Sequence, residues 1–202
     1  MDNLFNNILQ PTIFEVPDAE IVYNPAFFDL ATANAIYQEL LEDISWQQDN
    51  IRVFGKVHPQ PRLTALHGNE GKPYSYANIT MQPHPWNTIL LKLKKQVETA
   101  AETIFTTVLL NQYRNGKDSN GWHADNEKEL GINPVIASLS FGAPRNFQMK
   151  HNHLQGKKLN IVLEHGSLLL MKGTTQHFWK HQIPKTAKPV EPRINLTFRV
   201  LV

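Results

Sequence analysis

Cysteine is absent from the 202 residues of the chain. A disulfide framework and a thiolate metal site are therefore excluded, and the composition is compatible with a reducing environment. No apolar run approaches the roughly 20 residues that a membrane-spanning helix needs. The first residues also lack the basic start and the apolar stretch of a secretory signal peptide. We therefore expect a soluble, intracellular protein with no membrane partner, cytoplasmic if bacterial and nuclear if eukaryotic.

Charge is also sparse, because charged residues make up only 19% of the chain and the net charge is +2. So small a positive balance permits contact with nucleic acid, but only local clustering of cations can argue for it. Apolar residues make up 41%, which at this length supports one domain with a sizeable core. We expect a monomer.

The first half of the chain contains two segments with the periodicity of amphipathic helices. Apolar residues recur at intervals of three and four after Asp29, a residue suited to cap a helix N-terminus. A second apolar stripe of the same spacing follows Pro85 and runs to residue 104. We expect both helices to pack on the outside of a sheet, and we assign them no catalytic role.

The second half reads as short strands separated by turns. The predicted strands are 106–113, 122–125, 135–141, 145–151, 158–163, 167–171, 177–183 and 193–200. Eight short strands in about a hundred residues predict an antiparallel double-stranded β-helix, or jelly roll. We therefore predict an α+β domain spanning residues 1–202. Its parts are an N-terminal bracing segment (1–49), a hairpin lid (50–85), a supporting helix (86–104) and the jelly-roll core (105–202).

The most distinctive chemistry lies in residues 111–127, which end on a His-x-Asp motif. Residues two apart on an extended chain point to the same face, so His123 and Asp125 would present an imidazole and a carboxylate side by side. A second histidine would complete a 2-His-1-carboxylate site for non-haem Fe(II). The candidates for this ligand are His151, His153, His165, His177 and His181. The pattern alone does not choose between His177 and His181, which share a face if that segment is extended.

The last predicted strand alternates strictly between polar and apolar residues. One face carries Arg193, Asn195, Thr197 and Arg199, and the other face is apolar. Two guanidinium groups on one face indicate either a solvated edge strand or a cavity that holds an anion, since arginine suits bidentate recognition of carboxylates.

Residues 51–62 are basic and aromatic, and Gly55 suits a hairpin tip. Tyr74 and Tyr76 would share a face if that segment is extended. One interpretation is an ordinary surface hairpin. The other is a lid that contacts nucleic acid, with cations for phosphates and aromatic rings for bases.

The order Asn-x-Tyr, His-x-Asp, His-x-x-Pro and Arg-x-Asn-x-Thr-x-Arg resembles the AlkB family of Fe(II)/2-oxoglutarate-dependent dioxygenases. The resemblance covers residues 50–202 and is strongest to the AlkB homologue 2 type, which repairs alkylated bases in duplex DNA. It implies Fe(II), bound by the catalytic residues His123, Asp125 and His181. It also implies 2-oxoglutarate and O2 as cosubstrates, with 2-oxoglutarate held by Asn111, Tyr113, Arg193, Asn195 and Arg199.

The same resemblance implies that the segment 50–85 is a nucleotide-recognition lid. The implied substrate-binding residues are Val53, Phe54, Gly55, Tyr74, Tyr76, Asn126 and Glu127. Phe54 would fill the gap left by a flipped base, and Tyr76 would stack on the damaged base. The implied reaction is oxidative demethylation of 1-methyladenine and 3-methylcytosine in DNA with release of formaldehyde. The alternatives that stay open are the same chemistry on RNA, on a protein side chain or on a small molecule, a non-catalytic jelly-roll module that binds nucleic acid, and a cupin-like zinc or manganese protein.

Overall fold

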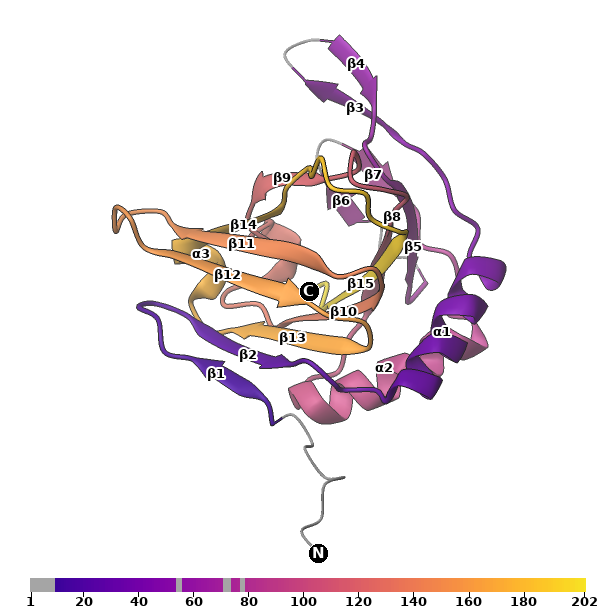
Figure 1. The fold of residues 1–202 in the computed structure, drawn as a ribbon, viewed down its shortest axis with the longest axis horizontal. Helices are drawn as coiled ribbons and strands as arrows, with labels where there is room; N and C mark the ends of the chain where they lie inside the picture. The colour runs from indigo at the N-terminus through magenta and orange to yellow at the C-terminus, as the bar shows by residue number, and fades with distance from the viewer. Residues whose placement is uncertain (1–9, 54–55, 71–73, 77–78) are drawn as a thin grey trace, which may run out of the picture.

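Two antiparallel β-sheets face each other in the computed structural model, which describes residues 10–53, 56–70, 74–76 and 79–202 (Figure 1). The larger sheet has the order β1 (Thr12–Phe14), β2 (Glu20–Asn24), β13 (Ser167–Lys172), β10 (Ile136–Gly142), β15 (Arg193–Arg199), β8 (Thr107–Tyr113) and β5 (Leu63–Gly68). The smaller sheet has the order β12 (Lys158–Leu163), β11 (Arg145–His151), β14 (Trp179–Ile183) and β9 (Asn120–His123). The predicted α+β class with a jelly-roll core is confirmed.

Both predicted helices are present, and side-chain caps fix their first turns. Helix α1 (Leu30–Asp43) begins after Asp29, whose carboxylate accepts a hydrogen bond from the Thr32 N–H at 2.9 Å. Helix α2 (Thr88–Ala101) begins after Asn87, whose side chain accepts from the Leu90 N–H. The apolar faces of both helices pack against the outer face of the larger sheet, as the sequence pattern predicts.

Strand β15 shows how alternation divides the core into two layers. Ile194, Leu196 and Phe198 belong to the cluster between the helices and the larger sheet. A second cluster lies between the two sheets and includes Leu109 of β8 and Phe147 of β11. Because β15 lies between β10 and β8 and all of its residues are buried, its polar face lines the interior and the solvated-edge interpretation is excluded.

Two small hairpins lie outside these sheets. Strand β3 (Asn50–Val53) pairs with β4 (Lys56–Pro59), and β6 (Tyr74–Tyr76) pairs with β7 (Ile79–Met81). The β3–β4 hairpin projects from the body of the protein (Figure 1). Strands β1, β2 and β5 belong to the larger sheet, so this sheet extends beyond the 105–202 segment into parts predicted as brace and lid.

Two predicted strands differ from those observed. Strand β9 ends at His123, so Asp125 follows the strand instead of continuing it, and its N–H is bound by the Gln176 side chain. The segment before β14 forms the short helix α3 (Thr175–Phe178), because the N–H groups of His177 and Phe178 bond back to the Thr174 carbonyl. The 3-10 helix η1 (Lys128–Leu130) completes the elements. None of the helices in the described ranges is long and apolar enough to span a membrane.

Candidate active site

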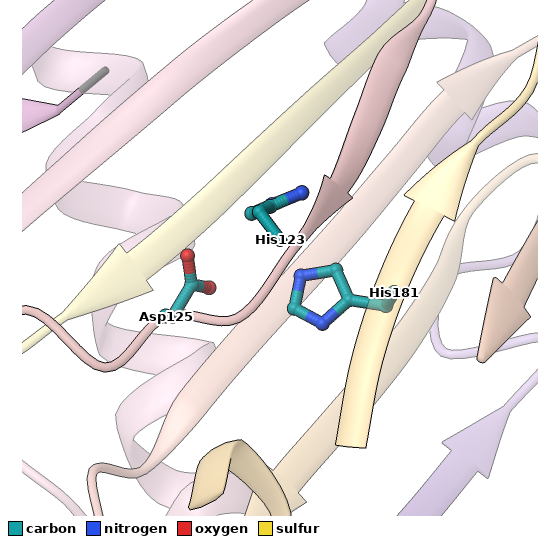
Figure 2. A group of neighbouring side chains, drawn as sticks. All are labelled: His123, Asp125 and His181. Carbon is teal, nitrogen blue, oxygen red and sulfur yellow. The ribbon is translucent and has the colours of Figure 1, made fainter. Parts of the chain in front are cut away.

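Three side chains with metal-binding atoms meet between the two sheets (Figure 2). His123 at the end of β9 is paired in register with His181 of β14, and their ring centroids are 4.3 Å apart. Asp125 joins them from the segment after β9, and one ligand atom from each residue lies within 4.8 Å of the others. The structure therefore brings His181 to the His-x-Asp pair. His177 is exposed on α3, with its Nε2 2.9 Å from Asn133 Oδ1.

The electrostatics favour the protonation states that bind a metal. Burial and the nearby His123 lower the pKa of His181 to about 3, and burial lowers the pKa of His123. Burial alone would raise the pKa of Asp125, but the Arg199 charge and then the histidines outweigh it and lower that pKa to about 2. Arg199 Nη2 donates to Asp125 Oδ1 at 2.9 Å. At neutral pH the site thus offers two neutral imidazoles and one carboxylate, the forms that a metal needs.

The polar face of β15 lies beside this group. Arg193 is 1% exposed, and its Nη2 donates to Ser140 Oγ at 2.9 Å. Its Nε and Nη1 are buried without a hydrogen-bond partner in the described part of the chain. Burial lowers the pKa of Arg193 to about 10, offset in part by Tyr113, so the group stays charged at neutral pH. Buried guanidinium donors are costly to leave unsatisfied, so this site fits a carboxylate ligand such as that of 2-oxoglutarate.

Neighbouring strands hold the amide side chains of the site in place. In the antiparallel register Asn195 lies opposite Asn111. Asn195 Nδ2 donates to Ser138 Oγ at 2.7 Å, and Asn111 Oδ1 accepts from Arg62 Nε at 2.7 Å. All eight residues that the sequence predicts for metal and cosubstrate line the same cavity: Asn111, Tyr113, His123, Asp125, His181, Arg193, Asn195 and Arg199.

Four polar residues around this cavity had no predicted role. Ser138 and Ser140 could have been found, because they alternate with apolar residues on a predicted core strand and therefore share a face. Arg62 and Gln176 gave no comparable signal. Both are almost fully buried, and they reach the site only through the tertiary fold. Arg62 contacts Asn111, and Gln176 Oε1 accepts a hydrogen bond from the Asp125 N–H at 2.9 Å.

The structure describes only some of the predicted substrate-binding residues. Asn126 is exposed and Glu127 partly exposed, directly after Asp125. The backbone of Val53 lies in β3, and Tyr74 and Tyr76 begin and end β6. Their side chains, like Phe54 and Gly55 altogether, lie outside the described residues.

Comparison with known proteins identifies the family to which the chain belongs. A family model for the 2OG-Fe(II) oxygenase superfamily matches residues 20–199. Alpha-ketoglutarate-dependent dioxygenase alkB homolog 3 from Bos taurus is 44% identical, over 88% of this chain and 64% of that protein. DNA oxidative demethylase ALKBH2 from Homo sapiens is 37% identical, over 87% of this chain and 71% of that protein. The chain therefore spans slightly less than two thirds of the homolog 3 relative.

Solved structures agree on the fold. The structure of OsALKBH1 matches with a TM-score of 0.67 at 15% identity, covering 95% of this chain and 100% of that one. A prolyl hydroxylase from Trichoplax adhaerens matches with a TM-score of 0.62 at 13% identity, covering 90% and 83%. Both types of relative match. The homolog 3 protein of Bos taurus is 44% identical and the ALKBH2 protein of the same species 38%, so the resemblance to the homologue 2 type that the motifs carry is present but is not the stronger of the two. The chain belongs to the 2OG-Fe(II) oxygenase superfamily and, within it, to the AlkB family.

Proposed function

We propose that the protein is an Fe(II)- and 2-oxoglutarate-dependent dioxygenase that oxidatively demethylates N-alkylated bases in DNA. The observation that carries this proposal is a single cavity that combines two kinds of site. Two neutral histidines and an ionised aspartate converge on one side. On the other side lies a buried guanidinium whose Nε and Nη1 have no protein partner among the residues described. A binding module would gain nothing from a facial metal site beside a buried cation.

Each side chain then has a task. His123, Asp125 and His181 would hold Fe(II), which would supply the activation of O2. Arg193 binds the distal carboxylate of 2-oxoglutarate with its free donors. Because Arg62 occupies the Oδ1 of Asn111, that amide offers its Nδ2 to the cosubstrate. Tyr113 hydrogen-bonds the same molecule. Asn195 Nδ2 donates to Ser138 Oγ and to the Leu139 carbonyl, so it binds the cosubstrate in exchange for one of these bonds. Arg199 keeps the Asp125 carboxylate ionised near the keto-acid end of the cosubstrate.

The cofactor system supplies the oxidation, while the protein supplies position and exclusion of water. With Fe(II) and 2-oxoglutarate bound, O2 is reduced as 2-oxoglutarate loses CO2 to become succinate, and one oxygen atom enters a C–H bond of the N-alkyl group. The resulting N-hydroxymethyl group then breaks down. The hydroxyl group loses its proton, the C–N bond breaks and formaldehyde is released. The ring nitrogen keeps the electron pair, which restores the base.

Two observations support DNA as the substrate. Relatives that are 36–38% identical are named DNA oxidative demethylase. The β3–β4 and β6–β7 hairpins also form small sheets separate from the two main sheets, which supports a lid role. We propose that Val53, Phe54 and Gly55 form the finger that enters a duplex, that Tyr74 and Tyr76 stack on the flipped base, and that Asn126 and Glu127 contact its edge. The base must leave the stack to reach a metal site whose ligands Asp125 and His181 are buried.

The test is iron-dependent formaldehyde release from an oligonucleotide that contains 1-methyladenine or 3-methylcytosine. Matched duplex DNA, single-stranded DNA and RNA are compared at the same concentration. We expect release from DNA, faster from the duplex, and none without Fe(II) or without 2-oxoglutarate. Release from RNA alone would transfer the proposal to RNA. Succinate formation without formaldehyde from any of the three would keep the chemistry and reject the nucleic-acid substrate.

A further inference from the structure

Arg145, the first residue of β11, is a buried cation with no role in the site described above. It is 4% exposed, and arginine is rarely buried unless its charge is paired. Its partners are backbone carbonyls: Nη2 donates to Asp118 O at 3.0 Å and to Pro184 O at 2.7 Å, and Nη1 donates to Asn115 O at 3.3 Å. Within the described ranges no carboxylate forms an ion pair with Arg145, so its positive charge is not directly neutralised.

The Asp118 carboxylate could neutralise the Arg145 charge, but it is already bound by another arginine. The Asp118 carboxylate accepts two hydrogen bonds from the Arg114 side chain, from Nε at 2.8 Å and from Nη2 at 3.0 Å. Asp118 therefore meets Arg145 mainly through its backbone carbonyl. The partial charges of carbonyl oxygens satisfy the donors of Arg145, but they leave its net charge in place.

The Arg145 guanidinium lies against Tyr113, which is itself 2% exposed. Its Cζ is 5.6 Å from the centroid of the Tyr113 ring, and the Cζ of Arg193 is 5.1 Å from the same centroid. Contact with the ring stabilises each cation, but two buried cations beside one ring also repel each other. An anion bound by Arg193 offsets this repulsion, so the two cations together give a more positive potential at that site than Arg193 alone would give.

Arg145 also connects the segments that lead to the two histidine ligands. Asn115 and Asp118 lie in the turn between β8 and β9, and β9 ends on His123. Pro184 directly follows β14, which contains His181. One side chain thus holds both segments while its charge rests on the Tyr113 ring.

We propose that Arg145 is a positioning residue for the cosubstrate. It fixes Tyr113 next to Arg193 and adds a second positive charge against the Tyr113 ring, near the guanidinium that receives the distal carboxylate. This inference rests on the proposed function, because it requires 2-oxoglutarate as the cosubstrate. Arg145 itself contacts neither the metal ligands nor the substrate base.

The test compares two keto acids that share the metal-binding end. 2-Oxoglutarate has a distal carboxylate, whereas 2-oxopentanoate has a methyl group there. Binding of each to the Mn(II)-loaded protein is measured by calorimetry, so that no turnover is needed. We expect Arg145→Met to weaken 2-oxoglutarate about tenfold, which corresponds to about 1.4 kcal/mol, and to weaken 2-oxopentanoate distinctly less, because loss of the carbonyl contacts acts on both keto acids alike. Arg145→Lys keeps the charge without the planar fork and should lie between the two.

Lys180→Met is the control, because it removes one positive charge from the smaller sheet at an exposed residue of β14. It should change neither affinity. In turnover assays Arg145→Met should raise the KM for 2-oxoglutarate while kcat at saturation stays close to that of the unmodified protein.

The possible results distinguish a role of Arg145 in cosubstrate binding from a purely structural role. Equal weakening of both keto acids by Arg145→Met would show a merely structural role and overturn the inference. If Arg145→Met does not fold, Arg145→Lys decides by the same comparison. Failure of the unmodified protein to bind 2-oxoglutarate would reject the proposed function, whereas normal binding by both variants would reject only the role of Arg145.

Discussion

The two sheets contribute different halves of the cavity. The larger sheet supplies a fixed, cationic wall from β8 and β15, in which Arg193 and Asn195 are held by the serines of β10. The smaller sheet supplies the neutral imidazoles of His123 and His181 on β9 and β14. The wall suits a carboxylate and the imidazoles suit a metal, so cosubstrate recognition and metal binding should be separable by mutation.

The largest effect should come from the smaller sheet. His181→Ala removes a metal ligand, so Mn(II) binding should be lost and turnover should fall by more than the roughly 100-fold that loss of a group behind a ligand can cost. Circular dichroism should show an intact fold. His177→Ala is the matched control, because this exposed histidine lies four residues away in the same segment and should change neither quantity. Normal iron-dependent turnover by the His181 variant would reject the metal site.

Arg193→Met should produce the opposite pattern on the larger sheet. Mn(II) binding should persist, while the KM for 2-oxoglutarate should rise roughly a hundredfold, as expected for loss of about 2–3 kcal/mol of charged hydrogen bonding. The free energy of unfolding of the ligand-free protein should not fall by a similar amount, because two of the Arg193 nitrogens have no partner in the described structure. Arg193→Lys should be intermediate. Joint loss of metal and cosubstrate binding would show that the two halves are not separable.

The same contrast explains what the sequence could reveal. The period-two alternation of β15 is sufficient to place Arg193, Asn195 and Arg199 on one face, because a regular strand in a regular register preserves the pattern. The pattern around β9 and β14 is broken. Asp125 lies beyond the end of its strand, and α3 removes His177 from the predicted face. A choice between His177 and His181 therefore required family resemblance, which agrees with the observed geometry.

Tertiary contacts between distant segments were not readable from the sequence. Gln176 and Asp125 are 51 positions apart, and Arg62 and Asn111 are 49 apart. No local pattern links such residues, because their contact depends on how the sheets pack. The family resemblance also supplied the roles of lid residues such as Phe54 and Tyr76, and these roles stay predictions.

Gln176→Leu tests whether such a remote contact matters for the metal. It removes the acceptor of the Asp125 N–H and so loosens the segment that presents the carboxylate. Loss of a group that orients a ligand lowers metal affinity by about 10–100-fold, and we expect the lower end for Mn(II). Gln148→Leu is the control, since among the described residues it removes the side-chain acceptor of Gln182 Nε2, on β11 and away from Asp125 in the sequence. Equal effects of the two variants would assign Gln176 a general packing role.

The smallest effect should come from the ion pair between Arg199 and Asp125. This pair connects the cationic wall of the larger sheet to the three metal-binding residues. The folded pKa of Asp125 is about 2, below its ordinary value of 3.8. Its ionised form therefore stabilises the metal-free protein fully above pH 3.8, and this contribution is lost as the pH falls towards 2. Between pH 5 and pH 3 the advantage of the unmodified protein over Asp125→Asn should shrink by about 1 kcal/mol in urea unfolding. A constant difference across that range would mean that Arg199 does not hold Asp125 ionised, and that the two halves of the cavity are electrostatically independent.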